Sequence, residues 1–319
     1  MPGCAHHVER GLMLARVQQL MVAAWLALVL LWLAFGLGDS TAWSLVGALL
    51  FVGHAAFLLL EFSLAWWQNR LDPATHAKLG VILRAWLREA QVAPRVFAWQ
   101  QPFRSRVLTD HLPVAIDGDD GSTGESALRR GFVFIHGFVG NRGLWNPWLA
   151  QLKARDEVFC AISMEPLLGS VDAYVPLIDA AVRRVHASTG LAPVLVCHSM
   201  GGLAARAWLQ ACSADHRVHR VVTLGTPHHG TWLSRFGQSI NSRQMRQGSR
   251  WLTQLAQREP AARRALFICY YANCDNIVFP TSTAAWPGAE NRFVPGVSHV
   301  ALVFDTRVMQ EVLALVSAA

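Results

Sequence analysis

The chain begins with two long apolar segments that carry no charged residue. They cover residues 20–37 and 42–60, and only residues 38–41 separate them. Each segment has nearly the 20 or so apolar residues that an α-helix needs to cross the hydrocarbon core of a bilayer. We therefore expect two transmembrane helices joined by a tight turn, within a membrane anchor that covers residues 1–72. A helical hairpin buried in a soluble core and a cleaved signal peptide are the alternative interpretations.

The basic residues around these segments predict their orientation. The loop between the segments has none, whereas the flanking stretches contain Arg10, Arg16, Arg70, Lys78, Arg84 and Arg88. Lys and Arg accumulate on the cytoplasmic side of membranes. We therefore expect both ends of the hairpin to face the cytoplasm, in a multi-pass protein of a bacterial inner membrane. Glu61, at the end of the second apolar segment, is expected to reach water.

Residues 73–94 have the apolar spacing of an amphipathic helix. The charged residues that fall elsewhere on this helix are Lys78, Arg84, Arg88 and Glu89. Two placements are open, on the inner leaflet or against the domain that follows. Residues 95–108 have the pattern of a strand interrupted by Pro102, and residues 117–124, rich in Asp, Gly, Ser and Thr, are expected to form a surface loop.

From residue 131 onward, short apolar segments alternate with longer segments of helical spacing. The expected strands are 132–135, 158–163, 194–197, 218–224 and 266–271. The expected helices are 145–154, 171–188, 200–211 and 306–317. Continuous apolar strands separated by helices are typical of a parallel sheet covered on both faces. The sequence thus predicts an α/β fold for residues 73–319, in which the loops that follow the strands meet at one edge of the sheet.

Ser199 lies where one expected strand ends and the next helix begins. This turn resembles the G-x-S-x-G nucleophile elbow, in which the residues two positions away from the serine must be small. Gly201 fits the pattern, but Cys197 stands where the first glycine is usual, and this departure weakens the motif. A glycine-containing turn with an incidental serine is the alternative interpretation.

A serine nucleophile needs a histidine base and a carboxylate that orients the histidine. His299, in a Gly- and Pro-rich loop before the last helix, is the best histidine, and Asp275, after the strand that ends at residue 271, is the best carboxylate. The order Ser, Asp, His along the chain is the one found with such an elbow. Asp305 follows the histidine and is therefore a poorer candidate.

The tetrahedral intermediate of acyl transfer needs N–H donors for its oxyanion. The backbone N–H groups of Phe138 and Met200 are the natural pair, because each residue closely follows an expected strand. His136 and His198 are expected to support these loops rather than to act as bases.

Several ordered motifs resemble those of the α/β-hydrolase lipases, especially bacterial triacylglycerol lipases and related esterases. They lie at residues 135–138, 197–203 and 223–231, and the segments at 275–278, 287–291 and 294–299 are similar as well. The resemblance covers residues 131–319 and implies the α/β-hydrolase fold. It implies Ser199 as nucleophile, Asp275 as acid and His299 as base, with Phe138 and Met200 as oxyanion donors. Many secreted members bind calcium through an aspartate two residues after the histidine; Ala301 stands there, so we predict no calcium.

Residues 231–264 do not continue the alternation of strands and helices. Trp232, Phe236 and Trp251 are interspersed with arginines in this insertion. Such a composition suits an amphipathic lid over an apolar acyl pocket, with these three aromatic residues at the substrate. A helical cap with a solvated basic face is the alternative.

The composition agrees with a membrane anchor, because 53% of the residues are apolar and only 15% are charged. The net charge of +7 is spread along the chain without a nucleic-acid motif, so we expect a basic surface near the membrane and no nucleic-acid binding. The six cysteines lack metal-ligand spacing, and the pair His228 and His229 lacks a third ligand nearby. We therefore expect neither a metal nor a cofactor.

These features together predict a membrane-anchored serine hydrolase that cleaves carboxylic esters of lipids or other apolar acyl compounds. Acyl transfer, thioester hydrolysis and depolymerisation of an intracellular polyester are alternatives on the same fold. A catalytically inactive, membrane-bound binding module with a hydrolase fold is the alternative from another class. The expected partners are the membrane and a lipid or apolar ester substrate, with no nucleic acid, and protein partners are left unassigned.

Overall fold

The computed structural model describes residues 13–35, 41–74, 76–113 and 129–316. Its centre is a sheet of six parallel strands in the order β2-β1-β3-β4-β5-β6. The strands are β1 (Phe132–Ile135), β2 (Phe159–Ala161), β3 (Val194–His198), β4 (Arg220–Leu224), β5 (Phe267–Tyr271) and β6 (Glu290–Phe293). The predicted α/β fold is confirmed, and β6 is an additional strand that the sequence analysis did not identify.

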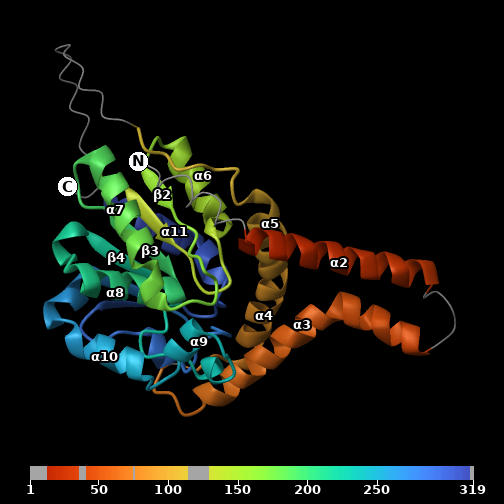
Figure 1. The fold of residues 1–319 in the computed structure, drawn as a ribbon. Helices are drawn as coiled ribbons and strands as arrows, with labels where there is room; N and C mark the ends of the chain where they lie inside the picture. The colour runs from red at the N-terminus through yellow and green to blue at the C-terminus, as the bar shows by residue number, and fades with distance from the viewer. Residues whose placement is uncertain (1–12, 36–40, 75, 114–128, 317–319) are drawn as a thin grey trace.

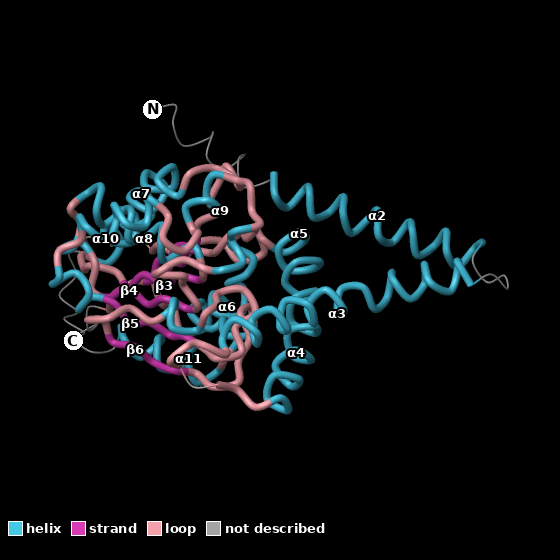
Figure 2. Tube along the Cα trace, turned by 90° about the horizontal axis from the view of Figure 1, so that it is seen from below, coloured by secondary structure: helices cyan, strands magenta, loops and turns pink. Residues whose placement is uncertain are grey.

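Helices cover both faces of the sheet (Figure 2). Phe132 and Phe134 of β1 face a cluster formed with α6 (Asn146–Ala154) and α11 (Thr306–Leu313). Val133 and Ile135 face the opposite cluster, formed with α7 (Val175–Thr189) and α8 (Met200–Cys212). Because successive side chains of a strand point to opposite faces and both faces are buried, all four residues of β1 are apolar.

Short helical turns connect these elements. They are η2 (Arg142–Trp145), η3 (Val171–Tyr174), η4 (Asp215–Arg217), η6 (Ala261–Leu266), η7 (Thr281–Ala284), η8 (Ala301–Phe304) and η9 (Ala314–Val316). The insertion at 231–264 contains η5 (Trp232–Arg235), α9 (Ile240–Gln244) and α10 (Arg250–Arg258). Its regular elements are therefore all helical, and loops and turns connect them.

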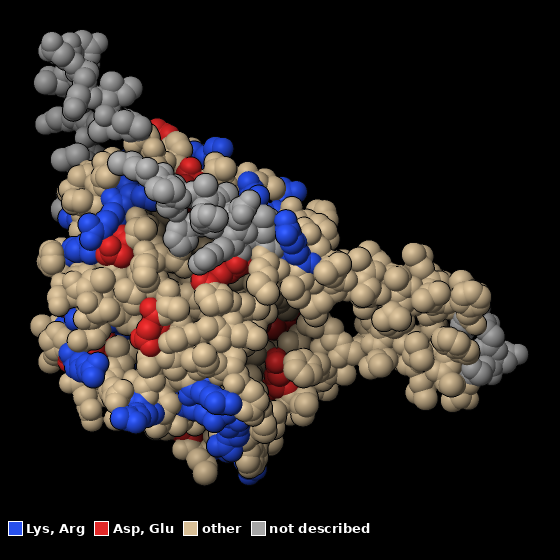
Figure 3. All heavy atoms as spheres, viewed as in Figure 1, with Lys and Arg blue, Asp and Glu red and all other residues tan. Residues whose placement is uncertain are grey.

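Two long apolar helices, α2 (Met13–Phe35) and α3 (Thr41–Asn69), form a hairpin that projects from the α/β domain (Figure 1). Both are long and apolar enough to cross a membrane. Their large side chains are mostly exposed, as for Leu20 (70%) and Leu49 (72%), whereas a core helix of a soluble protein would bury them. Figure 3 shows no charged side chain on the visible face of the projecting end. The turn between the helices and the loop expected at 117–124 lie outside the described residues.

The helix that follows the hairpin, α4 (Leu79–Pro94), packs against the α/β domain along Ala85, Glu89 and Ala93, all of which are buried. It is also bonded to the hairpin, because the Trp86 indole N–H donates to the carbonyl oxygen of Ala55 (2.9 Å). Of the two placements open from the sequence, the structure has the one against the domain.

Residues 95–104 are helical, so the strand-like reading of residues 95–108 was wrong. They form a π-helix, η1 (Arg95–Gln100), and a short α-helix, α5 (Gln101–Arg104). Pro102 lies in the first turn of α5, a position where proline is common. A contact with the hairpin holds this segment in place, since the Gln18 side-chain amide donates to Oε1 of Gln101 (2.7 Å).

Candidate active site

Ser199 lies on a sharp turn between β3 and α8. Its backbone has φ 53° and ψ −127°, a strained conformation that persists only where the surroundings enforce it. Two hydrogen bonds hold the turn: the Ser199 N–H donates to the carbonyl oxygen of Leu224 (2.9 Å), and the Thr226 hydroxyl donates to the carbonyl oxygen of Ser199 (2.8 Å). The turn therefore has the backbone geometry of a nucleophile elbow.

The two residues that flank this elbow differ in how tightly they are constrained. A Cβ atom at Gly201 would lie 2.5 Å from the carbonyl oxygen of Ile135 and 2.6 Å from that of His136, so only glycine fits. Cys197, by contrast, points into the core beside α7 and α8 and is fully buried. Burial raises the pKa of its thiol, which keeps the side chain neutral. A cysteine can therefore replace the usual glycine here, because its small side chain packs into the core.

His299 and Asp275 are hydrogen-bonded to each other. His299 Nδ1 lies 2.8 Å from Asp275 Oδ2. The other oxygen, Oδ1, accepts the backbone N–H groups of Ile277 (2.9 Å) and Val278 (2.7 Å), which fix the orientation of the carboxylate. Only 4% of His299 and 2% of Asp275 is exposed, so water screens their interaction weakly.

Gly225 places this pair beside the nucleophile. It follows Leu224, the residue that accepts the Ser199 N–H, and has a φ of 58°. A Cβ atom at Gly225 would lie 3.0 Å from Asp275 Oδ2 and 3.2 Å from His299 Nδ1. Ser199, His299 and Asp275 are therefore gathered around the carboxyl end of β4.

The surroundings of His299 favour its protonated form. Burial lowers the pKa of His299, but the charge and hydrogen bond of Asp275 and the nearby Glu89 and Glu61 raise it, and the net direction is upward. The ring of His198 packs on that of His299, with 4.6 Å between centroids. Burial, together with the charge of His299, holds the pKa of His198 well below its usual range. Of these two histidines, only His299 is suited to accept a proton near neutral pH.

The loop after β1 packs directly on the nucleophile. A Cβ atom at Gly137 would lie 2.7 Å from the Ser199 Cβ. Phe138 follows, and Val139 has a φ of 51°, which is unusual for a β-branched residue. Met200 begins α8, and the first N–H groups of a helix have no acceptor within it. Phe138 and Met200 thus lie on two segments that meet at Ser199.

His136 supports this loop, as the sequence analysis expected. Its Nδ1 lies 2.8 Å from the carbonyl oxygen of Gly137, and its Nε2 accepts the N–H of Met164 (2.8 Å). Burial lowers the pKa of His136 to about 4, so the ring is neutral with its proton on Nδ1. It joins the loops after β1 and β2.

His228 is enclosed by other side chains. Its Nε2 lies 3.1 Å from the Thr223 hydroxyl, and its ring stacks on Trp286 at 5.0 Å. Among the residues that the structure describes, no three His, Cys, Asp or Glu side chains are grouped to hold a metal ion.

The three aromatic residues proposed for the lid lie in two different places. Trp232 contacts Trp67 of α3 (5.9 Å between centroids) and Phe236 (5.2 Å), so Trp232 lies between the end of the hairpin and Phe236. Trp251 instead donates its indole N–H to Asp172 at the start of η3 (2.9 Å). Trp232 and Phe236 therefore lie near the hairpin, whereas Trp251 contacts the segment before α7.

Sequence analysis missed three residues that contact the loops of Asp275 and His299: Glu61, Glu89 and Asn276. Glu61 was expected to reach water, but it is 9% exposed and accepts the side-chain amide of Asn276 (2.7 Å). Glu89 was assigned to the polar part of its helix, but it is 1% exposed. Glu89 lies four residues from both Ala85 and Ala93, on the buried stripe of α4, and this spacing could have predicted its burial.

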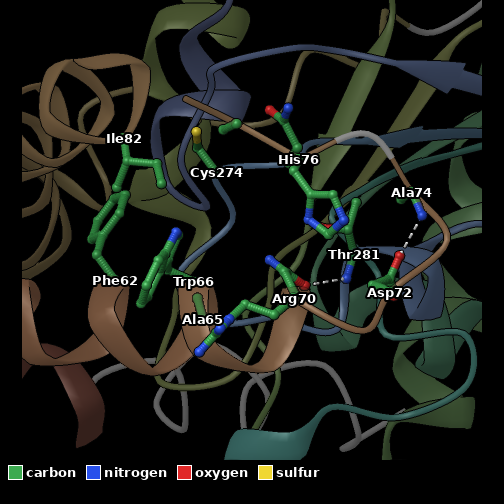
Figure 4. Close-up of a pocket in the computed structure, with 13 residues that line it drawn as sticks. Phe62, Ala65, Trp66, Arg70, Asp72, Ala74, His76, Ile82, Cys274 and Thr281 are labelled. Carbon is green, nitrogen blue, oxygen red and sulfur yellow. Dashed lines mark hydrogen bonds between the residues drawn. The ribbon is translucent and has the colours of Figure 1, made fainter. Parts of the chain in front are cut away.

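A cavity of about 240 Å³ lies where the hairpin meets the domain (Figure 4). Phe62, Ile82 and Cys274 lie on one side of it, and His76 and Thr281 on the other. None of Ser199, Asp275 and His299 lines it. It is therefore a feature of the junction rather than a binding site for the reacting group.

Comparisons with known proteins agree with the fold. A family model described as palmitoyl protein thioesterase matches residues 155–277, a stretch that includes Ser199 and Asp275 and ends before His299. No curated protein matches the sequence significantly. Among solved structures, the mature Bacillus licheniformis lipase BlEst2 has a TM-score of 0.54 and 19% identity, over 62% of this chain and 96% of that chain. Aspergillus fumigatus lipase B has a TM-score of 0.50 and 13% identity, over 78% of this chain and 77% of that chain.

At these identities the solved structures establish the fold alone. The parallel sheet, its strand order and the elbow after β3 all belong to that fold. The chain thus has the α/β-hydrolase fold predicted from its motifs, with two apolar helices before it and with similarity to lipases and, over residues 155–277, to palmitoyl protein thioesterases.

Proposed function

We propose that the protein is a membrane-anchored serine hydrolase that cleaves carboxylic esters of lipids or other apolar acyl compounds. The observation that carries the proposal is the strained Ser199 turn beside a buried His299–Asp275 pair. Strain of this kind is kept where it serves a site, and a nearly inaccessible hydrogen-bonded His–Asp pair is the usual means of activating a serine. Residues 73–319 would form the catalytic unit and residues 1–72 its anchor.

The reaction would proceed through an acyl-enzyme. His299 accepts the proton of Ser199 as its Oγ attacks the carbonyl carbon, and Asp275 stabilises the imidazolium that results. The N–H groups of Phe138 and Met200 donate to the oxyanion of the tetrahedral intermediate. His299 then gives its proton to the leaving alcohol, and a water molecule deprotonated by His299 releases the acid.

An apolar substrate is supported by the route that the fold offers to it. Trp232 of the insertion lies against Trp67 of α3, whose apolar surface is exposed along most of its length, and Phe236 packs on Trp232. A lipid that leaves the bilayer along α3 would meet these side chains before it met water. The insertion at residues 231–264 would in this way serve as the lid or wall of the acyl site.

A thioester substrate is the second candidate, and the family match over residues 155–277 favours it. Thioesters and oxygen esters share the acyl group and the oxyanion, so the same residues would act on both. The test compares hydrolysis of a palmitoyl oxygen ester with that of a palmitoyl thioester by the full chain in detergent, with Ser199→Ala as control. Oxygen-ester hydrolysis that Ser199→Ala abolishes supports the main proposal, and thioester turnover alone supports the second. A folded wild-type protein without either activity would refute both.

The basic residues around the hairpin support a cytoplasmic catalytic domain. A reporter enzyme fused after Ala319 should therefore behave as cytoplasmic. Clear export of the fusion would reverse this orientation while leaving the proposed chemistry intact.

A further inference from the structure

Glu89 of α4 binds the loop that carries His299. Its Oε2 accepts the hydroxyl of Ser298 (2.7 Å) and the N–H of Ala301 (3.1 Å), and its Oε1 accepts the N–H of Val300 (2.9 Å). These donors lie on both sides of His299 in the chain. One carboxylate from a helix more than 200 residues earlier thus holds the backbone around His299 from both directions.

A second carboxylate, Glu61 of α3, acts on the same loops from the end of the hairpin. Its Oε2 accepts the side-chain amide of Asn276 (2.7 Å), and Oδ1 of Asn276 accepts the backbone N–H of His299 (3.3 Å). Asn276 directly follows Asp275. The amide of Asn276 therefore connects the loops of Asp275 and His299, and Glu61 fixes the orientation of that amide.

Apolar contacts join the same parts of the chain. Phe62 of α3 and Ala85 of α4 form a buried cluster with Cys274, the residue before Asp275. Gly296 in the histidine loop approaches α4 so closely that a Cβ atom there would lie 2.9 Å from Val81 Cγ1. The hairpin and α4 thus contact the residues next to both Asp275 and His299.

We propose that Glu89 and Glu61 are positioning residues that hold the catalytic acid and base in register, so that α3 and α4 are part of the catalytic apparatus as well as the attachment to the membrane. The inference rests on the proposed function. It goes beyond it because it assigns a role in catalysis to helices that lie before residues 131–319, the part of the chain whose motifs resemble those of lipases. Neither residue touches the substrate; each acts through the loops that carry Asp275 and His299.

Glu89→Gln in the full chain provides the first test. A glutamine side chain has one oxygen and one NH₂ group, so either rotamer of its amide leaves a buried N–H of Val300 or Ala301 without an acceptor. We expect kcat to fall about 10- to 100-fold at nearly unchanged KM, because the loss acts on the position of the base and not on substrate binding.

Asp72→Asn is the matched control. Asp72 is also a buried carboxylate that joins the end of the hairpin to the domain, but it accepts the N–H and hydroxyl of Ser282, outside both catalytic loops. The Asp72→Asn variant should have a kcat within about twofold of wild type. If Asp72→Asn reduces kcat as much as Glu89→Gln does, attachment of the hairpin matters in general and the positioning role is refuted.

A pair of substitutions at Glu61 separates positioning from packing. Glu61→Gln keeps an oxygen that accepts the amide of Asn276 and should retain kcat within about threefold, whereas Glu61→Met removes the acceptor and should lose about tenfold or more. Equal activity of the two variants would overturn the role of Glu61. Full activity of a folded Glu89→Gln would overturn that of Glu89.

Hydrogen exchange gives a readout that does not depend on turnover. The N–H groups of Ile277 and Val278 bind Asp275 and make no contact with Glu89 or Glu61. They should exchange faster in Glu89→Gln and Glu61→Met than in wild type or Asp72→Asn. Unchanged exchange at these positions would refute the inference even if wild type proved inactive, whereas inactive wild type with the expected exchange would refute only the proposed function. If Glu89→Gln does not fold, Ser298→Ala, which removes one of the three donors, takes its place.

Discussion

Replacement of Asp275 by asparagine tests the chemistry assigned to the buried pair. Its Oδ2 lies 2.8 Å from His299 Nδ1, and the charges of a carboxylate and an imidazolium at such a contact are centred about 4 Å apart. At an effective dielectric constant of about 20, that attraction is about 4 kcal/mol. Because about 1.4 kcal/mol corresponds to a factor of ten, loss of the charge should reduce kcat about 10³-fold. The asparagine can also favour the wrong tautomer of His299, which extends the loss to about 10⁴-fold.

The assay is steady-state hydrolysis of an ester by the full chain in detergent, with thermal unfolding as the check that the variant is folded. Asp305→Asn is the matched control, since Asp305 caps α11 by accepting the N–H groups of Arg307 and Val308 (3.1 Å each), and asparagine caps as well. It should retain full activity. A folded Asp275→Asn within about tenfold of wild type, or an Asp305→Asn that is equally impaired, would refute the assignment of Asp275.

Three further predictions follow from the described contacts. In Gly201→Ala the new Cβ would displace the carbonyl oxygens that pack against the elbow, so kcat should fall at least about 100-fold in a folded protein. Near-normal turnover would contradict the steric argument. Glu259→Gln leaves the buried charge of Arg206 without its carboxylate partner, so it should lower the free energy of unfolding by about 3–5 kcal/mol. Denaturant unfolding measures this change, and a decrease below about 1 kcal/mol would contradict the importance of the pair. The rising limb of kcat/KM against pH should have its midpoint above 6.5, because the base must be neutral and the pKa of His299 is raised; a midpoint clearly below 6.5 would contradict the role of its acidic neighbours.

The parts that could be predicted from the sequence are those with a local pattern. Buried parallel strands are mostly apolar, so five of the six strands were recognised. The small residues around Ser199 indicated the turn. Because the loops after parallel strands lie at one edge of the sheet, the loops after β1, β3 and β4 were expected to meet there. β6 was missed because Glu290–Phe293 is polar and lies at the exposed edge of the sheet, where no apolar run is needed.

The remaining features depend on contacts between residues far apart in the chain. Nothing near Glu89 indicates that it binds the loop around His299, because its partners lie more than 200 residues later. Residues 95–108 were wrongly predicted as a strand, because apolar residues on either side of a proline fit a strand as well as a helix that packs against α2. Only the spacing of Glu89 with Ala85 and Ala93 pointed to burial of a carboxylate.

The central claim is that Ser199 is an activated nucleophile, and covalent labelling tests it most directly. The full chain in detergent is treated with a fluorophosphonate, digested and examined by mass spectrometry, beside Ser199→Ala and a heat-denatured wild-type sample. We predict a single adduct on Ser199 in the folded wild type and none in either control. A folded wild type that remains unlabelled, or that carries the adduct on another residue, would contradict the account.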